Sequence, residues 1–172
     1  METVQVRGYV LSSLKRFVGE SYGTKGSDAW MMFMPACSSA FYRKQIDSDA
    51  WYPMQKALLI PLEWMCALFH DGELVGARKF GHYLSEKHPV VEQAVLSTAA
   101  PGDAGQAEAV LQVLFGSGAM DALIAILPGQ RSERVHPALE NLIGGCLERS
   151  VSRSGEDHLR NLAGASLVKV EA

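Results

Sequence analysis

The chain has 172 residues, a formal net charge of −3, 48% hydrophobic residues and 20% charged residues. This length predicts one domain over residues 1–172, and the composition is that of an ordinary globular protein. The slightly acidic balance and the lack of a basic run argue against nucleic acid as a partner. The longest apolar run, residues 57–69, contains Pro61 and Glu63 and is shorter than the ~20 residues of a membrane span.

The three cysteines indicate the compartment. Cys37, Cys66 and Cys146 are widely spaced and odd in number, which favours reduced thiols over a disulfide framework. Lys15 and Arg16 interrupt the first apolar segment, so it does not resemble a secretory signal. The sequence therefore predicts a cytoplasmic protein.

Hydrophobic periodicity predicts helices through most of the first half of the chain. Residues 8–22 form an amphipathic pattern that Gly23 ends, and a short helix over residues 29–34 ends before Pro35. Residues 37–50 show no sustained period and are expected to be a loop.

The next predicted helix contains a proline, and another helix follows it. Apolar spacing predicts a helix over residues 53–69, with Pro61 bending it near residues 57–61 because proline lacks a backbone donor. Residues 70–72 break this helix, and residues 73–87 form another.

Shorter elements follow. A helix is expected over residues 89–98, a mobile loop over residues 99–105 and a helix over residues 107–115. Residues 119–127 are a short apolar run that fits a strand or a helix equally well.

The end of the chain decides the predicted fold class. A long helix is expected over residues 137–151, and the alternation near the end of residues 158–172 predicts a hairpin, with Gly164 available for its turn. Helices first and a sheet last make an α+β domain, in which N-terminal helices pack with a small C-terminal antiparallel sheet.

Catalytic and cofactor motifs are missing from the sequence. There is no GxGxxG, Walker A, HExxH, CxxC or GxSxG pattern. Cys66 and His70 lie four residues apart on one helix face, but two ligands do not make a metal site. We therefore expect no enzyme, no metal and no cofactor.

An aromatic-rich segment, residues 47–73, is the candidate pocket. Its large apolar groups at helical spacing are first of all core, yet Trp64 falls off the apolar stripe and its indole donor needs a partner. The following helix adds a histidine and a tyrosine. The candidate ligand-binding residues are Trp51, Tyr52, Trp64, Met65, Phe69, His82 and Tyr83.

Two adjacent glycines interrupt the late helix pattern. Gly144 and Gly145 each cost ~1 kcal/mol of helix propensity relative to alanine, so a close backbone approach is expected there. The approaching backbone belongs either to the same chain or to a second subunit, and both interpretations stay open. We predict a homodimer with Gly144 or Gly145 at or next to the contact.

Several short motifs resemble a known family. The strings VQVRGYVLSSLKRFVGESYG, DAWYP, GELVGARKFGHYLSEKH and LIGGCLERSVSRSG look like a myxobacterial paralogous family of uncharacterised regulatory domains. That family is distantly similar to the ligand-binding superfamily of four-vinyl-reductase-like domains, TRAPP subunits and H-NOX domains. The resemblance implies a turn and a late helix motif that here comprise Trp51, Tyr52, Pro53, Gly145, Leu147 and Glu148.

The resemblance implies a sensory role without haem. The Y-x-S-x-R motif of H-NOX domains does not occur in this chain, so haem of that type is not expected. Two functions stay open: a cytoplasmic sensory or regulatory domain with a small apolar ligand in a helix–sheet pocket, or a ligand-free dimeric module that binds a protein partner.

Overall fold

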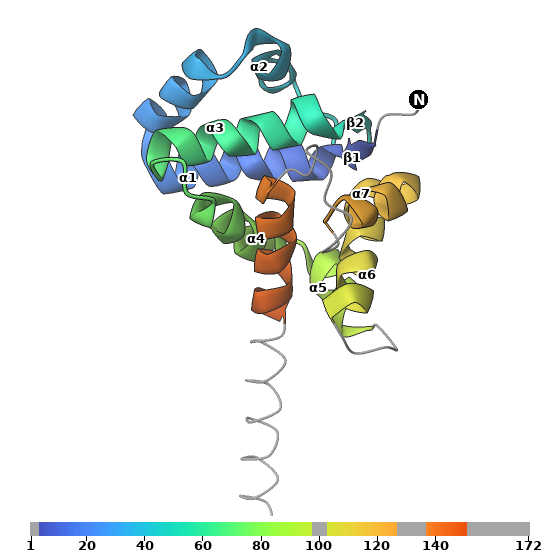
Figure 1. Ribbon diagram of the computed structural model, residues 1–172. Coiled ribbons are helices and arrows are strands. Elements are labelled where there is room, and N and C mark those ends of the chain that lie inside the picture. Colours follow the sequence, from blue (N-terminus) through green and yellow to red (C-terminus); the bar gives the residue numbers. More distant parts are fainter. Residues whose placement is uncertain (1–3, 98–102, 127–136, 151–172) are drawn as a thin grey trace, which may run out of the picture.

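A computed structural model describes residues 4–97, 103–126 and 137–150, and helices dominate it (Figure 1). A final helix over residues 137–150, called the late helix below, is drawn in orange. The elements before it are, in chain order, β1 (Gln5–Arg7), α1 (Gly8–Phe33), α2 (Ala36–Arg43), β2 (Trp51–Pro53), a π-helical turn (Gln55–Leu59), α3 (Ile60–Phe69), α4 (Val75–Lys87), α5 (Pro89–Leu96), α6 (Asp103–Phe115), a 3-10 turn (Gly116–Gly118) and α7 (Ala119–Ile126).

The predicted α+β class, with its sheet at the C-terminal end, is wrong. The sheet consists of β1 and β2, which pair antiparallel with Val6 opposite Tyr52. It therefore joins the start of the chain to its middle. Both strands have three residues, too few for an alternating pattern to be visible in the sequence. The hairpin predicted over residues 158–172 lies outside the described residues.

The predicted break at Gly23 is confirmed. Gly23 has φ 74° and ψ −176°, which divides α1 into two helical parts, and α1 ends at Phe33, before Pro35. The loop predicted from residue 37 onward is wrong at its start, because α2 is helical. Its Ser38 and Ser39 are buried, and buried serines leave no apolar period that a sequence could reveal.

A π-helical turn lies where the bend at Pro61 was predicted. Pro61 has no N–H, so the carbonyl of Ala57 loses its usual helical donor. The buried hydroxyl of Tyr42 donates to that carbonyl at 2.5 Å. The buried indole of Trp30 donates to the carbonyl of Pro61 at 3.0 Å. Side chains from α1 and α2 thus complete the hydrogen bonding of the turn Gln55–Leu59 and of α3.

The ambiguous run after residue 118 is helical and forms α7. Helix α6 packs on both α5 and α7 (Figure 1). The buried apolar side chains of the helices form one core cluster. Within residues 4–97, 103–126 and 137–150, no helix combines the length and the apolar character needed to cross a bilayer.

The late helix crosses α4 at two glycines. A Cβ on Gly145 would lie 3.0 Å from the carbonyl carbon of Arg78, closer still to its oxygen, and 3.1 Å from the Cα of Gly81. A Cβ on Gly144 would meet only the guanidinium of Arg78, at 3.2 Å. The two helices therefore touch backbone to backbone. This contact within the chain is enough to explain why residue 145 is a glycine. The homodimer contact stays a prediction.

Candidate functional site

The predicted ligand residues of β2 serve local packing. Trp51 is 38% exposed and lies beneath the guanidinium of Arg7, at 4.3 Å from ring centroid to Cζ. The hydroxyl of Tyr52 accepts a hydrogen bond from the backbone N–H of Asp47 at 3.0 Å. Trp51 therefore packs against the start of the chain, and Tyr52 fixes the loop before β2.

The predicted residues of α3 lie in or against the core. Met65 is fully buried, and Trp64 is partly buried against the core cluster. Phe69 stacks on Tyr22 of α1 with ring centroids 3.9 Å apart. The structure therefore does not bring these side chains together with Trp51 around a common space.

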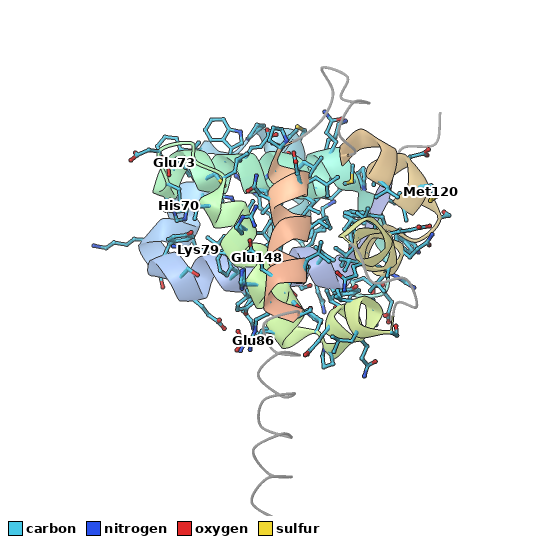
Figure 2. All side chains as sticks on the ribbon, turned by 60° about the horizontal axis from the view of Figure 1, so that its bottom comes forward. His70, Glu73, Lys79, Glu86, Met120 and Glu148 are labelled. Atoms are coloured by element: carbon cyan, nitrogen blue, oxygen red, sulfur yellow. The ribbon has the colours of Figure 1, made fainter. Side chains whose placement is uncertain are left out.

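The two predicted residues of α4 have different environments. Glu148 of the late helix, labelled in Figure 2, accepts a hydrogen bond from His82 Nε2 at 2.9 Å. Arg78 binds the other oxygen of the same carboxylate. The interaction with His82, together with Arg78, lowers the pKa of the Glu148 carboxyl. Tyr83, in contrast, lines the cleft described next.

A cleft of about 370 Å³ opens between α1, the end of α4 and the loop before β2. We call it the α1–α4 cleft. Hydroxyl groups, two cations and an imidazole surround it, contributed by Tyr9, Ser12, Ser13, Arg16, Ser48, Tyr83, Lys87 and His88.

A glycine at the start of α1 places Ser48 in this cleft. The backbone N–H groups of Gly8 and Tyr9 donate to the carbonyls of Ala50 and Ser48 at 2.9 and 3.1 Å. A Cβ at Gly8 would collide with the carbonyl oxygen of Asp47. The loop therefore lies directly on the first turn of α1 and occupies donors that a helix N-terminus otherwise leaves free.

Ser13 and His88 form the inner wall of the cleft. Ser13 Oγ and His88 Nε2 are 2.5 Å apart, and the Tyr9 ring lies 4.9 Å from the imidazole, centroid to centroid. Ser13 is only 6% exposed, although the sequence pattern placed it on the solvent face of α1. Burial of the ring, and then the nearby charge of Arg16, lower the pKa of His88.

Two cations lie at the outer edge of the cleft. Arg16 pairs with Glu20 at 3.9 Å, one turn along α1, and both side chains are largely exposed. Lys87 Nζ lies 5.6 Å from the centroid of the Tyr83 ring, and no ion pair of Lys87 occurs among the described residues. Both charged side chains in the lining are therefore cations, and the Glu20 and Glu86 carboxylates lie near them but outside it.

The Tyr83 hydroxyl is a buried donor that lies beside the Glu20 carboxylate. Its oxygen is buried, and no hydrogen bond of acceptable geometry reaches it within the described part of the chain. Burial, followed by the neighbouring Glu20 carboxylate, raises the pKa of Tyr83 to about 12, so the hydroxyl keeps its hydrogen at neutral pH. A ligand oxygen at the cleft would offer this hydroxyl an acceptor other than Glu20.

The geometry of the cleft suits ligand binding better than catalysis. Ser13 and His88 have the nucleophile–base contact of a hydrolase, but Ser13 lies inside α1, whose backbone donors are used within the helix. Acyl transfer needs free donors beside the developing oxyanion, and an interior helical serine does not offer its own N–H. Among the described residues, no group of three or more His, Cys, Asp or Glu side chains is arranged to hold a metal ion.

Most residues of the cleft were missed from the sequence. The available signal was local: Ser12, Ser13 and Arg16 share the polar side of the first helix. His88 stands directly before the proline that begins α5, so its position next to Ser13 depends on how the helices pack. Only the tertiary fold joins these two segments.

The chain matches no protein-family model, no curated protein and no solved structure. The resemblance to the myxobacterial regulatory family therefore stays a prediction.

Proposed function

We propose that the chain is a small-ligand-binding domain whose ligand carries an oxyanion group, namely a carboxylate, phosphate or sulfate. One observation supports this most directly: serine and tyrosine hydroxyls converge with Arg16, Lys87 and His88 on a single cleft. Cations and hydroxyl donors are the groups that bind oxyanions in proteins. A regulatory role in the cytoplasm, without catalysis, remains part of this proposal.

An oxyanion suits this cleft better than the apolar ligand predicted from the sequence. The aromatic residues of the predicted pocket are used in the core and in local stacking, and only Tyr83, which also packs on Phe17 and Phe80, lines the cleft. The cleft has no carboxylate in its lining. An apolar molecule there would leave two cations and several hydroxyls without new partners, whereas an oxyanion accepts from them.

The test is titration of ¹⁵N-labelled protein with sodium sulfate at constant ionic strength, followed by amide chemical shifts. We expect saturable shifts in the segments around Ser13 and His88. Arg16→Gln and Lys87→Gln should each weaken binding about three- to tenfold, because each removes one charge-assisted contact from a solvent-exposed edge.

Lys25→Gln is the matched control. Lys25 is an exposed cation of the same helix, beyond Gly23, and does not line the cleft. It should leave the dissociation constant unchanged. Shifts that do not saturate, or that respond equally to all three substitutions, would reject the proposed function.

A further inference from the structure

The Ser13–His88 pair makes the cleft responsive to protons. At 2.5 Å the two groups share one hydrogen bond, and His88 is half-buried at the junction of α4 and α5. When the neutral ring carries its hydrogen on Nδ1, Nε2 accepts the hydroxyl hydrogen of Ser13. The hydroxyl is then unable to donate to a ligand.

The groups around His88 disfavour its charged form in the empty cleft. Arg16 and the Tyr9 ring face it from α1, Lys87 and Tyr83 from the end of α4, and Ser48 from the loop. Two of these five groups are cations and none is a carboxylate. Glu86, two residues before His88 on α4, is the nearest acidic residue along the chain, and its charge acts on Tyr83. Glu92, in the first turn of α5, has its own interaction.

A bound oxyanion changes this balance. It brings negative charge next to the imidazole and thereby favours the imidazolium. The imidazolium must donate from Nε2, so Ser13 Oγ becomes the acceptor and its hydroxyl hydrogen is released toward the cleft. One proton taken from solvent thus adds both a positive charge and a hydroxyl donor to the site.

We propose that oxyanion binding in the α1–α4 cleft is coupled to the uptake of one proton by His88, which frees the Ser13 hydroxyl to donate to the ligand. This inference rests on the proposed function and adds a regulation to it: the site holds its ligand more tightly as pH falls. Affinity rises through the range between the bound and the free pKa of His88 and is flat outside it.

The experiment uses sulfate, which stays fully ionised between pH 5 and pH 8, so that its own titration does not contribute. Dissociation constants are measured by amide shifts across this range, and the imidazole Cε1–H signal of His88 is titrated with and without saturating sulfate. We expect sulfate to bind about three- to tenfold more tightly at the acidic end, and the pKa of His88 to rise by the corresponding ~0.5 to 1.

Two variants locate the effect. His88→Gln keeps a polar side chain that does not titrate, and should bind sulfate with a dissociation constant independent of pH. His82→Gln removes a histidine outside the cleft and should retain the full pH dependence.

The outcomes separate the two claims. Sulfate binding that is equally tight at all pH values, with an unchanged His88 titration, overturns proton coupling and leaves the binding site in place. A pH dependence that persists in His88→Gln also overturns it. Absence of binding at every pH removes the proposed function and this inference together.

Discussion

Gly145→Ala should destabilise the protein by about 1–2 kcal/mol, although alanine is the better helix former. Helix propensity alone would stabilise the late helix by ~1 kcal/mol. The new methyl group would, however, meet the backbone of Arg78 and Gly81 on α4, with the Arg78 carbonyl carbon at 3.0 Å. Backbone atoms cannot rotate away, so the helices must separate, and overpacking of this kind costs ~1–3 kcal/mol before the lost core contacts are counted.

Gly144→Ala is the neighbouring control with the opposite expected sign. Its methyl group meets only the end of the Arg78 side chain, which is 40% exposed and can move aside. The propensity gain should then appear as a stabilisation of up to ~1 kcal/mol. Urea unfolding followed by circular dichroism gives both free energies of unfolding. If Gly145→Ala is as stable as Gly144→Ala, the backbone contact does not constrain the late helix.

Three further substitutions or conditions test the fold. Tyr42→Phe should cost about 1–3 kcal/mol of unfolding free energy, because it leaves the buried carbonyl of Ala57 without a donor. Gly116→Ala should cost more than ~1 kcal/mol, since Gly116 has φ 56° and its Cβ would lie 2.6 Å from the Trp51 ring. Stability should fall as pH drops below about 6.5, because burial, then Lys79, lowers the pKa of His70 and folding favours its neutral form.

Each of these three predictions has a control variant. Tyr52→Phe removes a hydroxyl that pairs with an exposed backbone N–H and should cost less than Tyr42→Phe. Gly19→Ala adds a methyl group with no neighbour within 4 Å inside α1 and should stabilise the protein. His70→Gln should reduce the loss of stability below pH 6.5, leaving the part due to His88, whose pKa is also lowered. An equal loss in parent and variant would contradict the assignment.

Helices with strong apolar spacing were predictable from the sequence, and so were the irregularities that glycine and proline cause in them. The break at Gly23 and the irregular, π-helical turn before Pro61 follow from properties of single residues, which act locally in any fold. The β1–β2 pair was not predictable, because its strands have three residues each and its paired residues lie between 44 (Arg7 with Trp51) and 48 (Gln5 with Pro53) positions apart, so no local pattern marks them. Helix α2 was missed because its buried face includes Ser38 and Ser39.

The candidate site was less predictable than the fold. Aromatic residues drew attention to the segment of Trp51 and Trp64, where large rings mostly fill the core or pack on the surface. The cleft depends instead on Ser13, an ordinary residue by sequence, and on His88, 75 positions later. Tyr83 was the one predicted ligand residue that lines it, because it shares α4 with that end of the cleft.

Helix α4 connects the late helix to the cleft. Gly81 receives the backbone of the late helix, while Tyr83 and Lys87, within the next two turns, line the cleft. An α-helix moves largely as a unit, because its backbone groups are bonded to one another along its length. Separation of the helices in Gly145→Ala must therefore displace the α4 wall of the cleft as well. Sulfate affinity should fall in that variant and stay unchanged in Gly144→Ala, whereas equal affinity in both would mean that the cleft is held by α1 and its loop alone.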